Sequence, residues 1–174
     1  MDAREGLERL NSLDAAEAET ELLKCCGSTA WARALAARRP FDGERELSAA
    51  ADEIWWRLSE RDWLEAFAAH PRIGGRGTAA ERAQPPQAAC WSEQEQSGAR
   101  DAAQATLDEL AAANRAYEEK FGHIYIVCAT GKTADEMLAL LRARLSNDAD
   151  TELRNAAAEQ QKITMLRLEK LLTT

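Results

Sequence analysis

Apolar residues recur at helical spacing in one segment after another over the first 70 positions of the chain. Residues that start or stop helices bound these segments, such as Asp14 and Ser28 at their beginnings and Gly27 at an end. Ser59 opens the last of them and has Asp62 three residues later, which is the spacing of a capping box. The pattern predicts helices over about residues 14–26, 28–39, 44–58 and 59–70.

Three further helical patterns follow in the second half of the chain. The longest runs from Ser92 to about Phe121, where Gly122 suits the left-handed position that ends a helix. Thr133, with Glu136 as its capping partner, opens the next one. The pattern predicts helices over about residues 92–121 and 133–145, and a last one from Asp148 or Asp150 to about Leu172.

Two regions interrupt the helices. Residues 124–129 form the only β-branched and aromatic run of the chain, and no second strand is available to pair with it, so we expect a buried extended or irregular segment. Proline and glycine crowd the stretch after residue 70, which predicts one long loop between helices. The sequence therefore predicts an all-α fold, a single-domain helical bundle over residues 1–174 with one long Pro/Gly-rich loop.

His70 is a candidate proton carrier at the exit of a helix. Pro71 disfavours helical geometry at residue 70, so the imidazole can point into a cleft instead of along a helix surface. Histidine is the side chain whose unperturbed pKa lies nearest neutrality. The simpler interpretation is a polar residue that closes a helix and interacts with its dipole.

Glu95 also has two interpretations. With Ser92 it has the spacing of a capping box, which alone would account for both residues. It also follows the same loop that begins after His70, so folding could bring its carboxylate and the imidazole together at one cleft. Arg167 is a candidate for binding substrate, but it also has a structural interpretation, because an arginine on a helix usually lays its stem over apolar neighbours.

The main chain of residues 125–129 could bind a ligand, because an unpaired apolar segment must satisfy its N–H and C=O groups somehow. A buried core segment is the alternative.

Composition narrows the classes of partner. The chain has 22 Lys and Arg against 30 Asp and Glu, a net charge of −8, with the basic residues scattered; nucleic acid and anionic membranes are therefore unexpected partners. No apolar run approaches the ~18 residues of a membrane helix, and no secretory pattern opens the chain, so we expect a cytoplasmic protein. We expect Cys25, Cys26, Cys90 and Cys128 to be reduced, apolar fillers, and no metal-ligand spacing is present.

Several motifs, taken in order, resemble the 2-oxo-4-hydroxy-4-carboxy-5-ureidoimidazoline (OHCU) decarboxylases of urate degradation, and the similarity spans nearly the whole chain. The motifs are His70-Pro71-Arg72-Ile73-Gly74, Ser92-x-x-Glu95-Gln96, Tyr117-x-x-Lys120-Phe121-Gly122 with Tyr125–Ala129, and Glu159-x-x-Lys162-Ile163-x-x-x-Arg167-Leu168. The chain departs from the family pattern at His123-Ile124, where members often have a bulky apolar residue and proline.

This resemblance implies an all-helical homodimeric carboxy-lyase that converts OHCU to (S)-allantoin and carbon dioxide without metal or cofactor. It implies that His70 is the catalytic acid/base, and we expect Glu95 to orient the substrate and share in proton transfer. The positions that match substrate contacts in the family are Pro71, Ser92, Glu93, Gln94, Glu95, Gln96, Tyr125, Ile126, Val127, Cys128, Ala129 and Arg167.

The alternative is a non-enzymatic helical interaction module. Its acidic surface and five tryptophans could bind a partner, although tryptophans at helical positions usually lie in the hydrophobic core. An enzyme should order the loop around a pocket that contains His70 and Glu95, whereas a binding module would leave both solvated.

Overall fold

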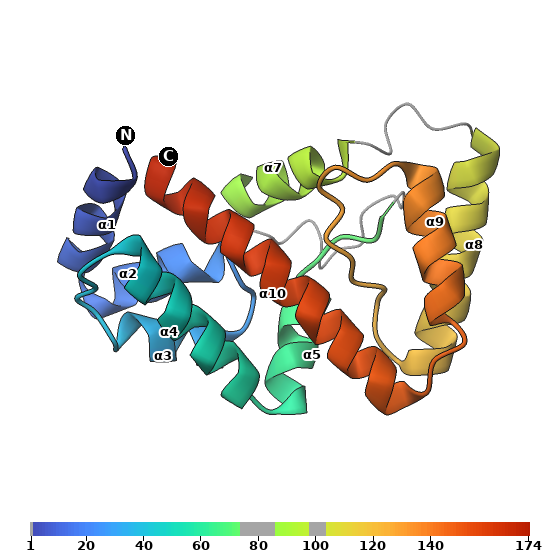
Figure 1. The fold of residues 1–174 in the computed structure, drawn as a ribbon, viewed down its shortest axis with the longest axis horizontal. Helices are drawn as coiled ribbons and strands as arrows, with labels where there is room; N and C mark the ends of the chain where they lie inside the picture. Colours follow the sequence, from blue (N-terminus) through green and yellow to red (C-terminus); the bar gives the residue numbers. More distant parts are fainter. Residues whose placement is uncertain (1, 74–85, 98–103) are drawn as a thin grey trace. The chain divides into compact units, whose positions relative to one another are not determined.

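The computed structural model describes residues 2–73, 86–97 and 104–174, and every regular element in these ranges is a helix (Figure 1). This confirms the all-α prediction. Most of the predicted Pro/Gly-rich loop, residues 74–85, lies outside the described residues. The helices are α1 (Ala3–Ser12), α2 (Ala15–Leu23), α3 (Thr29–Ala36), α4 (Glu44–Arg57), α5 (Glu60–Ala68), α7 (Pro86–Glu95), α8 (Gln104–Phe121), α9 (Ala134–Arg144) and α10 (Ala149–Thr173).

The chain divides into two compact units. Unit 1 contains Met1–Ala66 and Gln161–Thr174, and unit 2 contains Phe67–Gln160. The prediction of a single domain stays a prediction. None of the helices in the described ranges is both long and apolar enough to cross a membrane.

In unit 1, side chains close the first turns of α1, α2, α3 and α5, whereas Gly43 at the start of α4 makes no side-chain cap. Asp14 caps α2 and Ser28 caps α3, as predicted, and Ser59 and Asp62 form the predicted capping box. The helix α1 was not predicted from its polar sequence, although Asp2 and Glu5 close it with a complete capping box. Leu10, Leu22, Trp31, Leu35, Leu47 and Trp55 fill the core of this unit.

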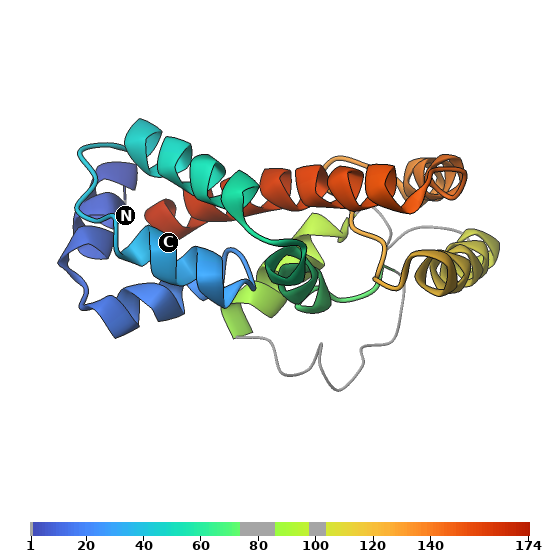
Figure 2. The same ribbon diagram turned by 90° about the horizontal axis from the view of Figure 1, so that it is seen from below.

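Unit 2 contains two helices, α8 and α9, that pack side by side and run in the same direction (Figures 1 and 2). Gly122, with a φ of +76°, ends α8 in the predicted left-handed conformation. The chain then returns along the helix pair as the unpaired segment 124–129, as predicted, and the capping box of Thr133 and Glu136 starts α9. Tyr117, Leu110, Tyr125, Met137 and Leu141 lie in the core between these elements.

The prediction of one continuous helix that starts at Ser92 and ends at about Phe121 is wrong, although its end is confirmed. The structure instead has α7 ending at Glu95 and α8 beginning at Gln104. Pro86 stands at the first position of α7, where its missing N–H is no loss, so this helix begins six residues before the predicted start. Ser92 therefore lies inside a helix, where its hydroxyl donates to the Ala88 carbonyl at 3.0 Å, and the predicted capping box of Ser92 with Glu95 does not exist.

Gly6 gives a direct test of the packing in unit 1. A Cβ at this position would lie 1.9 Å from the backbone oxygen of Leu172, so one of the two helices must shift. We expect Gly6→Ala to lower the free energy of unfolding by at least ~2 kcal/mol, as measured by chemical denaturation.

Gly43→Ala is the matched control, since nothing lies within 4 Å of its Cβ position and its φ of −171° is ordinary extended backbone. It should cost less than ~1 kcal/mol. Equal losses for the two variants would contradict the close approach at Gly6.

Candidate active site

His70 lies just beyond the end of α5, as its place before Pro71 predicts. Its backbone N–H donates to the Phe67 carbonyl at 3.0 Å, which closes the last turn, and the residue is half-buried. The Phe67 ring in turn packs against the His123 ring, with centroids 5.4 Å apart. The departure from the family motif at His123 thus lies next to the helix end that carries His70.

The chain after His70 is fixed to α8 by two polar contacts. Arg72 donates to both carboxylate oxygens of Glu118, at 2.7 and 2.8 Å, and the Asn114 amide donates to the Ile73 carbonyl at 3.2 Å. Ile73 itself is buried in the core of unit 2. His70-Pro71 therefore lies between the end of α5 and residues that are anchored to α8, and none of these contacts was predicted from the sequence.

Helix α7 buries two of the predicted site residues. Ser92 is 4% exposed and Glu95 is 8% exposed, whereas Glu93 and Gln94 are exposed and Gln96 is half-buried. Ser92 and Glu95 are three residues apart and therefore share one face of the helix. Because Glu95 closes no capping box, helix capping does not account for this buried carboxylate.

Residues 125–129 are all buried, and side chains from other elements hold part of their main chain. Arg144 donates to the Ile126 carbonyl at 2.7 Å. The Cys128 N–H donates to the Glu159 carboxylate at 2.7 Å, and Lys132 donates to the Cys128 carbonyl at 2.8 Å. Within the described part of the chain, the N–H and C=O of Val127 make no hydrogen bond.

A buried ion pair supports this segment. Glu152 is fully buried and accepts hydrogen bonds from Arg144 at 2.7 Å, from Asn147 at 2.8 Å and from the Tyr117 hydroxyl. Burial raises the pKa of the Glu152 carboxyl, but these hydrogen bonds outweigh it and hold the pKa below its ordinary value. Burial, together with the bond to Glu152, raises the pKa of Tyr117, so the phenol stays protonated.

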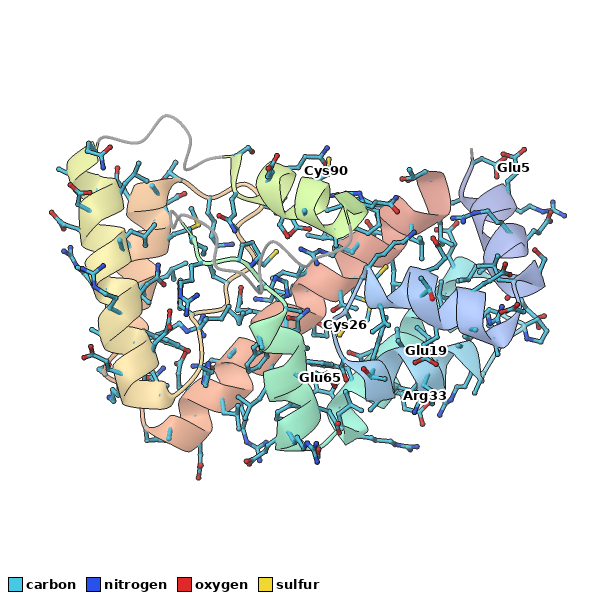
Figure 3. The ribbon with its side chains drawn as sticks, turned by 180° about the vertical axis from the view of Figure 1, so that it is seen from behind. Glu5, Glu19, Cys26, Arg33, Glu65 and Cys90 are labelled. Atoms are coloured by element: carbon cyan, nitrogen blue, oxygen red, sulfur yellow. The ribbon has the colours of Figure 1, made fainter. Side chains whose placement is uncertain are left out.

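Arg167 belongs to unit 1, where it is 4% exposed in α10 and its charge acts on two buried thiols. Burial raises the pKa of Cys26 to about 11, against the opposing effects of a hydrogen bond to the Ser28 backbone and of the Arg167 charge. The cysteines of the described residues are free thiols, and Cys25, Cys26 and Cys128 are buried as expected. The expectation is wrong for Cys90, which is exposed on α7 (Figure 3), because this helix begins earlier than predicted and turns that position outward.

Among residues 2–73, 86–97 and 104–174, no group of three or more His, Cys, Asp or Glu side chains is placed to hold a metal ion. The chemistry available in unit 2 is instead an imidazole, a buried carboxylate and partly unpaired main chain. Such a set can move protons and orient a small polar molecule.

These groups lie on an all-helical fold. The OHCU decarboxylase family matches residues 11–169, and the chain belongs to this family.

Named relatives and solved structures agree with this membership. The chain is 41% identical over 154 residues, 88% of its length, to the Arabidopsis thaliana "Uric acid degradation bifunctional protein TTL", and it covers 47% of that protein. It is 30% identical to the Amia calva "2-oxo-4-hydroxy-4-carboxy-5-ureidoimidazoline decarboxylase", with 77% of this chain and 75% of that protein covered. A crystal structure of OHCU decarboxylase in the presence of (S)-allantoin superposes with a TM-score of 0.76 at 38% identity, covering 88% of this chain and 98% of that one.

The buried ion pair predicts a pH-dependent stability. Because the pKa of Glu152 is lowered in the folded state, its contribution is fully present above its ordinary value of 4.5 and is lost as the pH falls through the folded-state pKa. We expect Glu152→Gln to lower the free energy of unfolding by about 3 kcal/mol at pH 7, and by progressively less below pH ~4.5. Urea denaturation of both proteins across this pH range measures the difference.

The control is Glu109→Gln, which breaks an exposed pair with Arg142 in the same unit. Exposed pairs contribute little, so this variant should stay within ~1 kcal/mol of the parent at every pH. A Glu152→Gln deficit that does not change with pH would contradict a lowered carboxyl pKa.

Proposed function

We propose that the chain decarboxylates OHCU to (S)-allantoin and carbon dioxide. The observation that carries the proposal is the family match over residues 11–169, which includes the motifs around His70, Glu95 and Arg167. The solved relative whose structure was determined in the presence of (S)-allantoin supports this choice of product. The chain spans about half the length of the Arabidopsis relative and a third of a Bacillus relative named "Uric acid degradation bifunctional protein".

The reaction needs an electron sink, and the substrate contains one. When the carboxylate leaves C4 as carbon dioxide, its bonding electrons form a C4=C5 double bond, and the electrons of the adjacent C=N bond move to the ring nitrogen, which takes up a proton. The result is an enol with the hydroxyl on C4. Loss of the proton from the 4-hydroxyl and addition of a proton to one face of C5 then complete the product. The protein must orient the ring and move these protons at nitrogen, oxygen and C5, and no metal or cofactor is required of it.

His70 is the proposed acid/base. Its backbone position beyond the end of α5, followed by Arg72 anchored to Glu118 on α8, supports this proposal. We assign Glu95 to orient a ring or ureido N–H and to assist proton transfer, since this carboxylate is buried on the same face of α7 as Ser92. Pro71 and the residues from Ser92 to Gln96 are the proposed contacts around these two groups.

Recognition of the ring is assigned to the main chain of residues 125–129. The N–H and C=O of Val127 have no partner among the described residues, and a buried main chain without partners is costly unless a ligand or water satisfies it. An amide or ureide edge offers the complementary acceptor and donor. Arg167 is proposed to bind a ring or ureido oxygen, because tight pairing with the leaving carboxylate would stabilise the ground state more than the transition state.

We further propose that the protein acts as a homodimer in the cytoplasm, as the resemblance implies. The test of function is addition of the protein to freshly made OHCU, with circular dichroism followed as (S)-allantoin appears. A well-folded protein that does not accelerate this signal would contradict the activity and would favour the helical interaction module.

Replacing His70 tests the acid/base role. We expect His70→Asn to lower turnover at least ~100-fold, because general acid/base groups contribute 10²–10⁴-fold, while thermal unfolding stays cooperative. Initial rates and melting curves are measured on the same samples. If His70 only closed the helix, the variant would lose ~1 kcal/mol of stability and keep its rate.

Replacing Glu95 separates charge from shape. Glu95→Gln keeps the size of the side chain and removes its charge, and we expect activity to fall ~10-fold or more as a charge-assisted hydrogen bond to the substrate is weakened. Glu119→Gln, an exposed position on α8, is the control for loss of one negative charge and should keep the parental rate. A fully active Glu95→Gln protein would remove Glu95 from the site.

A further inference from the structure

Glu159 is not among the predicted site residues, yet its carboxylate makes a short contact with the middle of the segment 125–129. Oε2 accepts the Cys128 N–H at 2.7 Å, across 31 positions of sequence. The acceptor comes from the part of α10 that belongs to unit 2, and the donor comes from a buried, non-helical segment. A hydrogen bond from a main-chain N–H to an ionised acceptor is among the stronger kinds.

Within the part of the chain that the structure describes, Val127 is a gap in the hydrogen bonding of the segment, in which the Ala129 carbonyl also accepts the Lys132 N–H at 3.0 Å. In an extended chain the N–H and C=O of one residue point to one side, and those of the next residue point to the other. Ile126 and Cys128 are held through Arg144, Glu159 and Lys132, whereas Val127 between them has no partner among the described residues. One edge of the segment is therefore fixed by side chains, and the other edge keeps an open donor and acceptor.

We infer that Glu159 is a positioning residue, which holds Cys128 so that the Val127 N–H and C=O stay aligned for the substrate. This inference rests on the proposed function, since it assigns the open edge to the ring or ureido group of OHCU. Glu159 does not touch the substrate in this scheme and acts through the main chain. Its essential property is a hydrogen-bond acceptor at the carboxylate position, and its charge is secondary.

Lys132 and Arg144 do not replace this contact. Lys132 donates to the Cys128 carbonyl and Arg144 to the Ile126 carbonyl, so both leave the Cys128 N–H without an acceptor when Glu159 is removed. The peptide plane between Val127 and Cys128 contains that N–H together with the Val127 carbonyl. Loss of the acceptor therefore frees the group that would accept from the substrate.

The test compares Glu159→Ala with Glu159→Gln, because glutamine keeps an oxygen that can accept the Cys128 N–H and alanine does not. We expect Glu159→Ala to raise KM for OHCU ~10-fold or more with kcat within about threefold, and Glu159→Gln to keep KM within about threefold. Hydrogen–deuterium exchange of the free protein should be faster over residues 125–129 in the alanine variant alone. This second readout does not depend on catalysis.

Glu136→Ala is the matched control. It removes a carboxylate that accepts a main-chain N–H, that of Thr133, at the same 2.7 Å, but it affects the first turn of α9. It should lower the melting temperature and leave KM unchanged. An active parent whose Glu159→Ala variant matches this control in KM and exchange would overturn the inference. A glutamine variant as impaired as the alanine variant would overturn it too, because charge would then be essential. An inactive parent would instead overturn the proposed function.

Discussion

Unit 2 depends on hydrogen bonds from side chains to the main chain of residues 125–129. Helices α8 and α9 run in the same direction, so the chain between them must travel back along their length in an extended form. Extended backbone normally pairs in a sheet, and none exists among the described residues. Arg144, Glu159 and Lys132 supply partners in its place, and Glu152 keeps the Arg144 guanidinium charged and aimed inside the unit.

Local signals in the sequence were sufficient for most helices. Capping residues act within one turn of the chain, so the starts of α2, α3, α5 and α9 could be located from side-chain type and spacing alone. The same rule failed at Ser92, where a correct capping pattern occurs inside a helix that Pro86 had already started. Helix α1 was missed although Asp2 and Glu5 have the same local spacing and form a complete capping box, so the signal was present in the sequence and was not used.

The candidate site, like the helices, has features that local sequence signals predict and features that they do not. Residue type and motif order predict His70, Glu95 and the segment 125–129 as site residues, because these signals lie in the chain itself, and this stays a prediction. The groups that hold them in place come from far along the sequence: Arg72 pairs with Glu118 across 46 positions, and Cys128 bonds to Glu159 across 31. No local periodicity specifies such pairs. The Glu159-x-x-Lys162 motif was visible, but only the folded chain assigns the glutamate an acceptor role.

Under the proposed function, hydrogen bonds from the main chain suit substrate recognition better than a charged side chain does. Addition of a proton to one face of C5 requires a fixed ring orientation relative to His70, and a main chain held at Ile126 and Cys128 provides donors and acceptors that lose no side-chain entropy on binding. An unpaired charge at the same place would bind the substrate carboxylate and resist its loss. Arg144 and Glu152 of unit 2 form an ion pair next to the segment, so their charges neutralise each other. They order the peptide groups, and the proposed chemistry is left to groups that can exchange a proton.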